Sequence, residues 1–94
     1  MTEKKQMILE KAIETCGSDH QLKMCLEEMS ELQKEICKAW RNRGDVEAIA
    51  EEVADVLITL DQLMLIYQIR DKVDGYYVQK MLRLDERLKE GNYE

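Results

Sequence analysis

The fold of this chain is decided between residues 26 and 67, which read LEEMSELQKEICKAWRNRGDVEAIAEEVADVLITLDQLMLIY. In both halves of this stretch, apolar residues recur at spacings of three and four, which is typical of amphipathic helices. A turn of about four residues, 41–44, separates the halves, and Asp45 can cap the helix that follows. Because so short a connection forces the two helices to run antiparallel, the sequence predicts a helical hairpin.

The rest of the chain adds one helix on each side of this hairpin. Pro and Phe are absent and only four glycines occur, which is the composition of helices joined by short turns. Gly17 ends the first helix, Ser18 and Gln21 resemble a capping box for the second, and Gly44 can take a left-handed stop position. We therefore expect an all-α fold, a four-helix antiparallel bundle-like subunit with helices at about residues 3–15, 18–42, 45–69 and 76–89, and a looser turn at 71–75.

The length and charge of the chain limit its possible partners. Its 94 residues allow one domain, which we place at residues 1–94. The formal charge of −6 and the pI of about 4.9 argue against nucleic acid as a partner. No apolar run approaches the roughly 20 residues that would cross a membrane. We therefore expect a globular protein that binds neither nucleic acid nor membrane.

The cysteines and the first residues point to the cytoplasm. Cys16, Cys25 and Cys37 are odd in number and show no CxxC spacing, and the N-terminus lacks the apolar core of a signal peptide. We expect a cytoplasmic protein with reduced thiols. The three thiols are predicted to be buried in helices, because no histidine accompanies them as a metal ligand or base.

Both helices of the hairpin carry an apolar stripe that we expect to form the core. A further apolar set on the second of these helices lies outside its stripe, which a four-helix monomer hardly covers. A chain of this length also buries only about 60–65% of the surface that its unfolded form exposes. We therefore expect a homo-oligomer, a dimer or a tetramer. The first stripe comprises Leu22, Cys25, Met29, Leu32, Ile36 and Trp40; the second comprises Ile49, Val53, Val56, Leu57, Leu60, Met64 and Tyr67; the further set comprises Ile58, Leu65, Ile66 and Ile69.

Acidic residues are concentrated in the hairpin. Nine of the twenty acids lie within residues 27–55, against four bases. At about 100° per residue, Glu28 and Glu31 lie in a narrow arc beside the first apolar stripe. Glu52 and Asp55 have the same relation to the second stripe. The two helices therefore offer matching acidic borders.

The antiparallel hairpin is expected to bring these borders together. Glu31 would face the neighbourhood of Asp55, with Glu28 and Glu52 within about a turn. Four converging carboxylates repel one another and cost stability unless a cation neutralises them. An all-oxygen cluster suits Mg²⁺ or Mn²⁺ far better than zinc or copper. A diiron centre would need Glu-x-x-His pairs, and the one histidine, His20, is in none.

The alternative interpretation of these acids is a solvated helix face. A single ExxE pair is roughly nine times more often surface than site. Two such pairs that face one another favour a site. The alternative stays open for the last helix, where Lys80, Arg83 and Arg87 share one arc. They can bind a polyphosphate held at the metal, or they can pair in solvent with nearby acids.

The segments LEEMSELQKEI (26–36) and EEVADVLITLDQL (51–63) resemble the ExxE and ExxD halves of the MazG-like all-α nucleoside triphosphate pyrophosphohydrolases. The similarity extends over about residues 21–67, and KMLRLDERL (80–88) is similar to the basic segment that closes short members. The resemblance implies a Mg²⁺-dependent enzyme that cleaves nucleoside triphosphates between the α and β phosphates, acting as a dimer or tetramer. It implies that the Mg²⁺ ligands are Glu28, Glu31, Glu52 and Asp55.

The resemblance also suggests further site residues. Some members stack an aromatic residue from the end of the first hairpin helix on the base, where this chain has Trp40; the alternative is that Trp40 seals the end of the hairpin as core. Lys80, Arg83 and Arg87 would bind the substrate. A carboxylate that is not committed to metal would accept the proton of the attacking water, with Glu35 or the weaker candidate Glu27 nearest.

Two other classes of function are compatible with the sequence. A small helical interaction protein would use the further apolar set for a partner and show no effect of divalent ions on melting. A non-catalytic carboxylate metal-binding module would be stabilised by the ion but release no pyrophosphate.

Overall fold

The computed structural model describes residues 2–91, and these residues form four α-helices and no strand. The helices are α1 (Glu3–Cys16), α2 (Ser18–Trp40), α3 (Val46–Tyr67) and α4 (Arg70–Lys89). The predicted all-α fold with four helices is confirmed. None of these helices combines the length and the apolar character that a membrane crossing requires.

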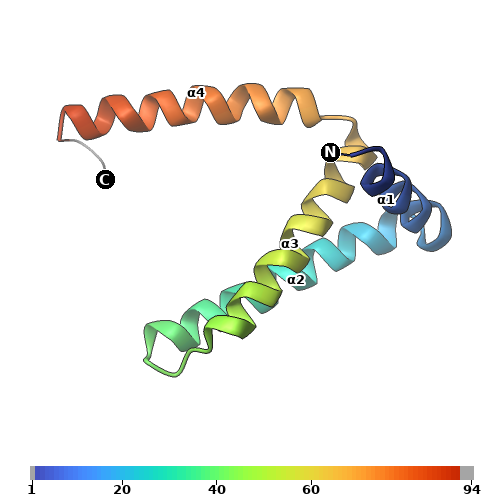
Figure 1. The fold of residues 1–94 in the computed structure, drawn as a ribbon, viewed down its shortest axis with the longest axis horizontal. Coiled ribbons are helices and arrows are strands. Elements are labelled where there is room, and N and C mark those ends of the chain that lie inside the picture. The colour runs from blue at the N-terminus through green and yellow to red at the C-terminus, as the bar shows by residue number, and fades with distance from the viewer. Residues whose placement is uncertain (1, 92–94) are drawn as a thin grey trace.

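The antiparallel hairpin of α2 and α3 is the main packing unit of the chain (Figure 1). α1 packs on both helices at the end of the hairpin that is far from the 41–45 loop. α4 leaves the end of α3 and extends away from the hairpin (Figure 1). Within the described residues it packs along none of the other three helices. A single chain therefore forms a three-helix unit with a projecting α4 and does not close the expected four-helix bundle.

The face of α3 that packs on α2 differs from the predicted one. Val56 is buried, but Val53 and Leu57 of the same predicted stripe are 39% and 57% exposed. The buried positions Thr59 and Gln62 lie on the opposite side of the helix from Leu57. The hairpin therefore buries a partly polar face of α3 and leaves much of its apolar stripe uncovered.

Two further burial predictions are wrong. Trp40 is 88% exposed at the end of α2, so it does not seal the hairpin. Cys25 is fully buried, but Cys16 and Cys37 are exposed, and all three thiols are free. Trp40 and Cys37 lie near the loop end of the hairpin, which no third helix covers, and Cys16 is the last residue of α1.

Side-chain N-caps begin α1 and α3, but not α2 or α4. The Asp45 side chain accepts a hydrogen bond from the backbone N–H of Glu47 (3.0 Å), which confirms it as the N-cap of α3. The Thr2 hydroxyl caps α1 in the same way, accepting from Lys5 (3.2 Å). The predicted capping box at Ser18 is wrong, because Gly17 occupies the N-cap position and Ser18 is already helical.

Gly44 allows the α2–α3 loop to pass close to Ala39 in the last turn of α2. The left-handed residue is Asn42 (φ 62°), so the predicted left-handed stop at Gly44 is wrong. A Cβ atom on Gly44 would lie 2.6 Å from both Cα and Cβ of Ala39. Glycine is required here because the returning chain touches the last turn of α2.

The α3–α4 connection is shorter than predicted. Gln68 is left-handed (φ 54°) and caps α3, and Ile69 is followed directly by α4. The predicted turn at 71–75 is wrong, because Gly75 lies inside α4. A Cβ atom added to Gly75 would have no neighbour within 4 Å. The guanidinium of Arg70 donates to the carboxylate of Asp61 (2.6 Å), which ties the start of α4 to α3.

Candidate functional site

Three carboxylates from the two helices of the hairpin meet in one place. One carboxylate oxygen from each of Glu28, Glu52 and Asp55 lies within 4.8 Å of the other two. Glu52 and Asp55 are three residues apart on α3, so their side chains project from one face. Glu28 follows Cys25, which is buried, by one turn of α2 and so lies beside the surface that faces α3. We call these three residues the carboxylate cluster.

The electrostatics of the carboxylate cluster disfavour three negative charges. Partial burial of Glu28, together with the negative charges of Asp55 and Glu52, raises the pKa of Glu28 above the ordinary glutamate range. The Oε2 atom of Glu52 is buried and has no hydrogen-bond partner. The ion pairs formed among residues 2–91 involve other acids. The cluster therefore holds excess negative charge and one unsatisfied buried acceptor.

A hard divalent cation fits this donor set. Carboxylate oxygens are the ligands that Mg²⁺ and Mn²⁺ prefer, and a bound ion would satisfy the buried oxygen of Glu52. Zinc and copper sites normally include nitrogen or sulfur ligands. Among the described residues no such atom joins the carboxylate cluster.

Glu31, the fourth predicted ligand, is exposed and does not join the other three. Three residues along a helix correspond to 300°, so Glu31 is turned about 60° further from the α3-facing side than Glu28. Glu35, the predicted base, is partly buried and forms an ion pair with Lys38 (3.2 Å). Glu27, its weaker alternative, is exposed.

A polar pocket of about 250 Å³ adjoins the carboxylate cluster between α2 and α3. Glu28 and Asp55 line it. Its buried polar residues Gln21, Thr59 and Gln62 were not predicted to belong to a site. These residues could have been found from the sequence, because they are polar and lie on the same helix faces as Glu28 and Asp55. The remaining lining residues are His20, Met24 and Ile58.

The predicted substrate-binding cations are not near the carboxylate cluster in one chain. Lys80 and Arg83 are exposed and Arg87 is partly buried, all on the projecting α4. Within the described residues none of the three forms an ion pair; Asp85 pairs with Lys89 instead (3.1 Å). Trp40 lies twelve residues beyond Glu28 on α2, about 18 Å along the helix axis. The structure therefore brings together three of the predicted site residues.

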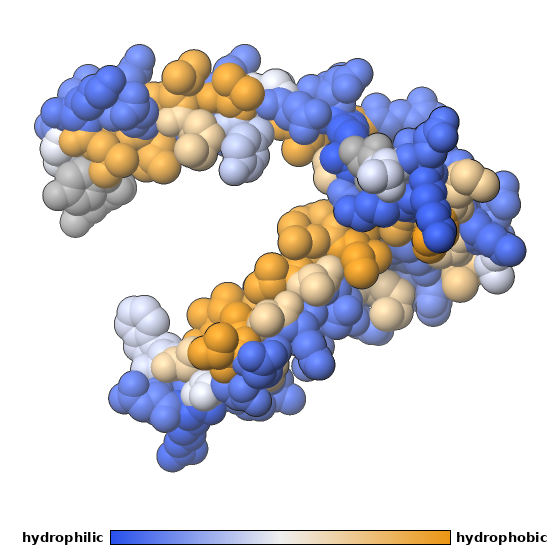
Figure 2. All heavy atoms as spheres, viewed as in Figure 1, coloured by the Kyte–Doolittle hydropathy of each residue, from blue (hydrophilic) through white to orange (hydrophobic). Residues whose placement is uncertain are grey.

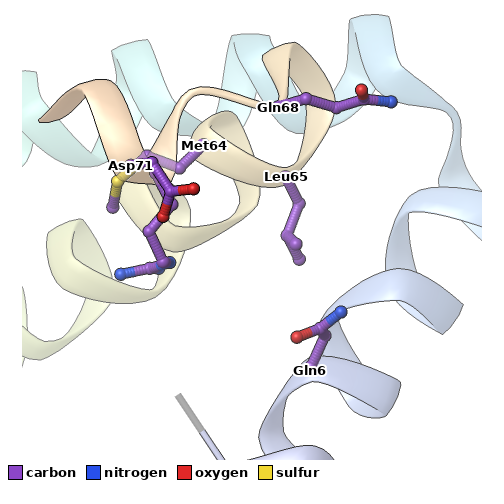
Figure 3. Close-up of a pocket in the computed structure, with 6 residues that line it drawn as sticks. Gln6, Met64, Leu65, Gln68 and Asp71 are labelled. Atoms are coloured by element: carbon purple, nitrogen blue, oxygen red, sulfur yellow. The ribbon is translucent and has the colours of Figure 1, made fainter.

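A second hollow, of about 370 Å³, lies where α1 meets the α3–α4 connection (Figure 3). Gln6 approaches it from α1, and Met64, Leu65, Gln68 and Asp71 line the opposite side (Figure 3). The guanidinium of Arg70, the charged group beside Asp71, is already bonded to Asp61. This hollow offers no convergent set of ligands or bases, so the carboxylate cluster is the stronger candidate.

Comparisons of the chain with protein-family models, with curated proteins and with solved structures found no match.

Proposed function

We propose that this protein is a Mg²⁺-dependent nucleoside triphosphate pyrophosphohydrolase, which cleaves the α–β phosphoanhydride and releases a nucleoside monophosphate and pyrophosphate. The observation that carries the proposal is the carboxylate cluster, with the unpartnered buried oxygen of Glu52. The resemblance of residues 26–36 and 51–63 to the ExxE and ExxD motifs supports the same assignment. Manganese can replace magnesium at an all-oxygen site.

The proposed ligands are Glu28, Glu52 and Asp55, joined by Glu31. The exposed side chain of Glu31 has room to change rotamer toward the other three. When bound, Mg²⁺ supplies charge that offsets the negative charge developing on the phosphates in the transition state. Placing the ligands on two packed helices keeps their carboxylates in position before substrate arrives.

Glu35 is the proposed general base. Its carboxylate, which is paired with Lys38, is not one of the three that form the carboxylate cluster, so it can accept a proton from the attacking water. Lys80, Arg83 and Arg87 are the proposed phosphate ligands, because guanidinium and ammonium groups donate hydrogen bonds to phosphate oxygens. Trp40 is assigned to the base by resemblance alone.

The test is a panel of ribo- and deoxyribonucleoside triphosphates incubated with the protein and Mg²⁺. Chromatography should detect the nucleoside monophosphate and pyrophosphate in equal amounts, and chelation of the metal should stop the reaction. Asp55→Asn is the matched negative control, since contaminating phosphatases are unaffected by it. Release of inorganic phosphate and a diphosphate would contradict α–β cleavage.

The interaction-protein alternative is favoured by one observation, the exposure of the large apolar side chains on α4. The nucleoside triphosphate panel separates the enzyme, the metal-binding module and the interaction protein if the melting temperature of the protein is also measured with and without Mg²⁺. No pyrophosphate with a Mg²⁺-induced rise in melting temperature would indicate the metal-binding module. No pyrophosphate and no rise would indicate the interaction protein.

A further inference from the structure

α4 carries an apolar stripe that nothing in the described chain covers. Its members recur at spacings of three and four and all are exposed. Figure 2 shows apolar atoms along α4 and along the side of α3 that is turned toward it. So extended an uncovered surface marks an interaction site. The stripe comprises Val73, Tyr77, Met81, Leu84 and Leu88.

An apolar groove of about 420 Å³ lies between α1 and α3, and its walls are mainly Ile8, Leu9, Ala54, Leu57 and Ile58. The charged residues of its lining are Lys5 and Asp61, and Asp61 is paired with Arg70. Ile8 and Leu57 are exposed although they are large and apolar. The groove therefore offers an apolar surface of the kind that a helix with an apolar stripe can fill.

This groove and the polar pocket beside the carboxylate cluster share a wall. Ile58 lines both, and Asp55 lies less than one turn before it on α3. A helix seated in the groove would therefore have one of its borders next to Asp55. On α4, Lys80, Arg83 and Arg87 form such a border, because they lie about 60–120° to one side of Tyr77.

The net charges of the helices α3 and α4 have opposite signs. α3 contains five acidic and no basic residues, whereas α4 contains six basic and four acidic residues. The net charges are therefore −5 and +2. Such a pairing favours α4 as the occupant of a groove on α3 over an acidic partner.

The α4 of the same chain is held away from this groove. Only Gln68 and Ile69 connect α3 to α4. The N–H of Ile69 donates to Met64 O (3.1 Å), and Arg70 is bonded to Asp61 (2.6 Å). These contacts direct α4 away from the hairpin (Figure 1). The occupant must therefore come from another molecule.

We propose that a second copy of this chain inserts its α4 into the α1–α3 groove, in a two-fold exchange that brings the basic border of each α4 to the carboxylate cluster of the other copy. The pairing is isologous, so each copy both gives and receives an α4. The composite site rests on the proposed function, since it supplies phosphate-binding cations that one chain does not bring to its own cluster. The exchange itself does not depend on that function.

The first test is the mass of the protein in solution. Sedimentation at micromolar concentration should give at least twice the 11.1 kDa chain mass. Met81→Glu places a charge in the apolar stripe and should yield monomer. Leu82→Glu is the matched control, because Leu82 is similarly exposed but lies about 100° from Met81, outside the stripe. A monomeric wild-type protein, or equal effects of the two variants, would overturn the exchange.

The second test asks which copy each α4 touches, and it needs no nucleotide. Ordinary and ¹⁵N-labelled protein are mixed, allowed to exchange subunits and treated with a carbodiimide, which joins lysine to nearby carboxylates. Cross-links from Lys80 to acids of α3 should join labelled to unlabelled peptides in about half of the pairs. Cross-links found only within one isotope would show that α4 folds onto its own chain and would overturn the proposal.

The third test joins the exchange to catalysis. Asp55→Asn removes a cluster ligand, and Lys80→Ala/Arg83→Ala removes two cations of α4. Each variant alone should be inactive, but an equal mixture should recover about a quarter of the wild-type rate, because half the dimers then contain one intact composite site. With an active wild type, no recovery would refute the composite site. With an inactive wild type, the proposed function fails while the mass and cross-links still decide the exchange.

Discussion

At the scale of single residues, Glu28 is the group whose titration most directly reports the carboxylate cluster. Its pKa is raised in the folded protein, so between the ordinary glutamate pKa and the folded pKa the native state holds more protons than the unfolded state. The free energy of unfolding of the metal-free protein should therefore be fully retained below the ordinary pKa and should fall as pH rises through the folded pKa. Urea melts in the presence of a chelator, between about pH 4 and pH 8, measure this slope.

Glu28→Gln is the control for this pH dependence. Glutamine has nearly the same size and does not titrate, so the variant should lose the part of the slope that comes from residue 28. Adding Mg²⁺ to the wild-type protein should stabilise it more at higher pH, because the ion binds the ionised carboxylates. An identical pH profile for wild type and variant would show that the carboxylate cluster does not perturb Glu28.

The ligands on α3 can be separated from a nearby acid by substitution. Glu52→Gln and Asp55→Asn preserve size but each remove one charge from the carboxylate cluster. Pyrophosphate release with Mg²⁺ should fall by orders of magnitude, while circular dichroism stays helical. Without metal, either change should leave the protein at least as stable as wild type, since repulsion is relieved.

Glu47→Gln is the matched control on the same helix. Glu47 is exposed and lies two turns before Asp55. Its substitution should change the free energy of unfolding by no more than about 0.5 kcal/mol and leave the rate intact. Equal, small effects of all three substitutions on pyrophosphate release would refute the assignment of Glu52 and Asp55.

At the scale of elements, the tight end of the hairpin can be tested by a pair of glycine substitutions. Gly44→Ala would place a Cβ 2.6 Å from Ala39, so the loop must shift, and the protein should lose about 1–3 kcal/mol of stability. Gly75→Ala adds a methyl group in open space inside α4 and should stabilise that helix by about 0.5–1 kcal/mol. Thermal melts of the two variants should shift in opposite directions.

A destabilised Gly75→Ala variant would contradict the continuous α4. If residues 71–75 formed a turn, as the sequence alone suggested, an alanine there would favour the wrong local structure. The same pair therefore tests where α4 begins and how closely the α2–α3 loop approaches α2.

At the scale of the whole molecule, a divalent ion that binds the carboxylate cluster should stabilise the folded protein. Mg²⁺ or Mn²⁺ binds the carboxylate cluster of the folded protein and not the dispersed acids of the unfolded chain. At 100 times its Kd the ion should add about 2.7 kcal/mol to the free energy of unfolding. Calorimetry with millimolar Mg²⁺ should show a higher melting temperature, and Asp55→Asn should reduce the shift. No shift with either ion would remove the metal site.

The sequence by itself determined the features that depend on neighbours along the chain. Helical periodicity placed the four helices except for residues 70–75 of α4, and the Asp45 cap was predictable because its hydrogen-bond partner is two residues away. The short loop determined the antiparallel hairpin. The spacing of Glu52 and Asp55 guaranteed that both would project from one side of a helix, so two of the three residues of the carboxylate cluster could be predicted from local geometry.

Only the tertiary structure decided which faces meet and what lies between them. The rotation of α3 buries Thr59 and Gln62 beside the carboxylate cluster and exposes Leu57, and the rotation of α2 leaves Glu31 outside the cluster. An apolar stripe predicts that a face will be covered, but not by which surface. In a short chain with a projecting α4, contacts between distant residues select one face for the hairpin and leave the other apolar face uncovered. The periodicity of a single helix cannot make that choice, because it is the same whichever neighbour covers the face.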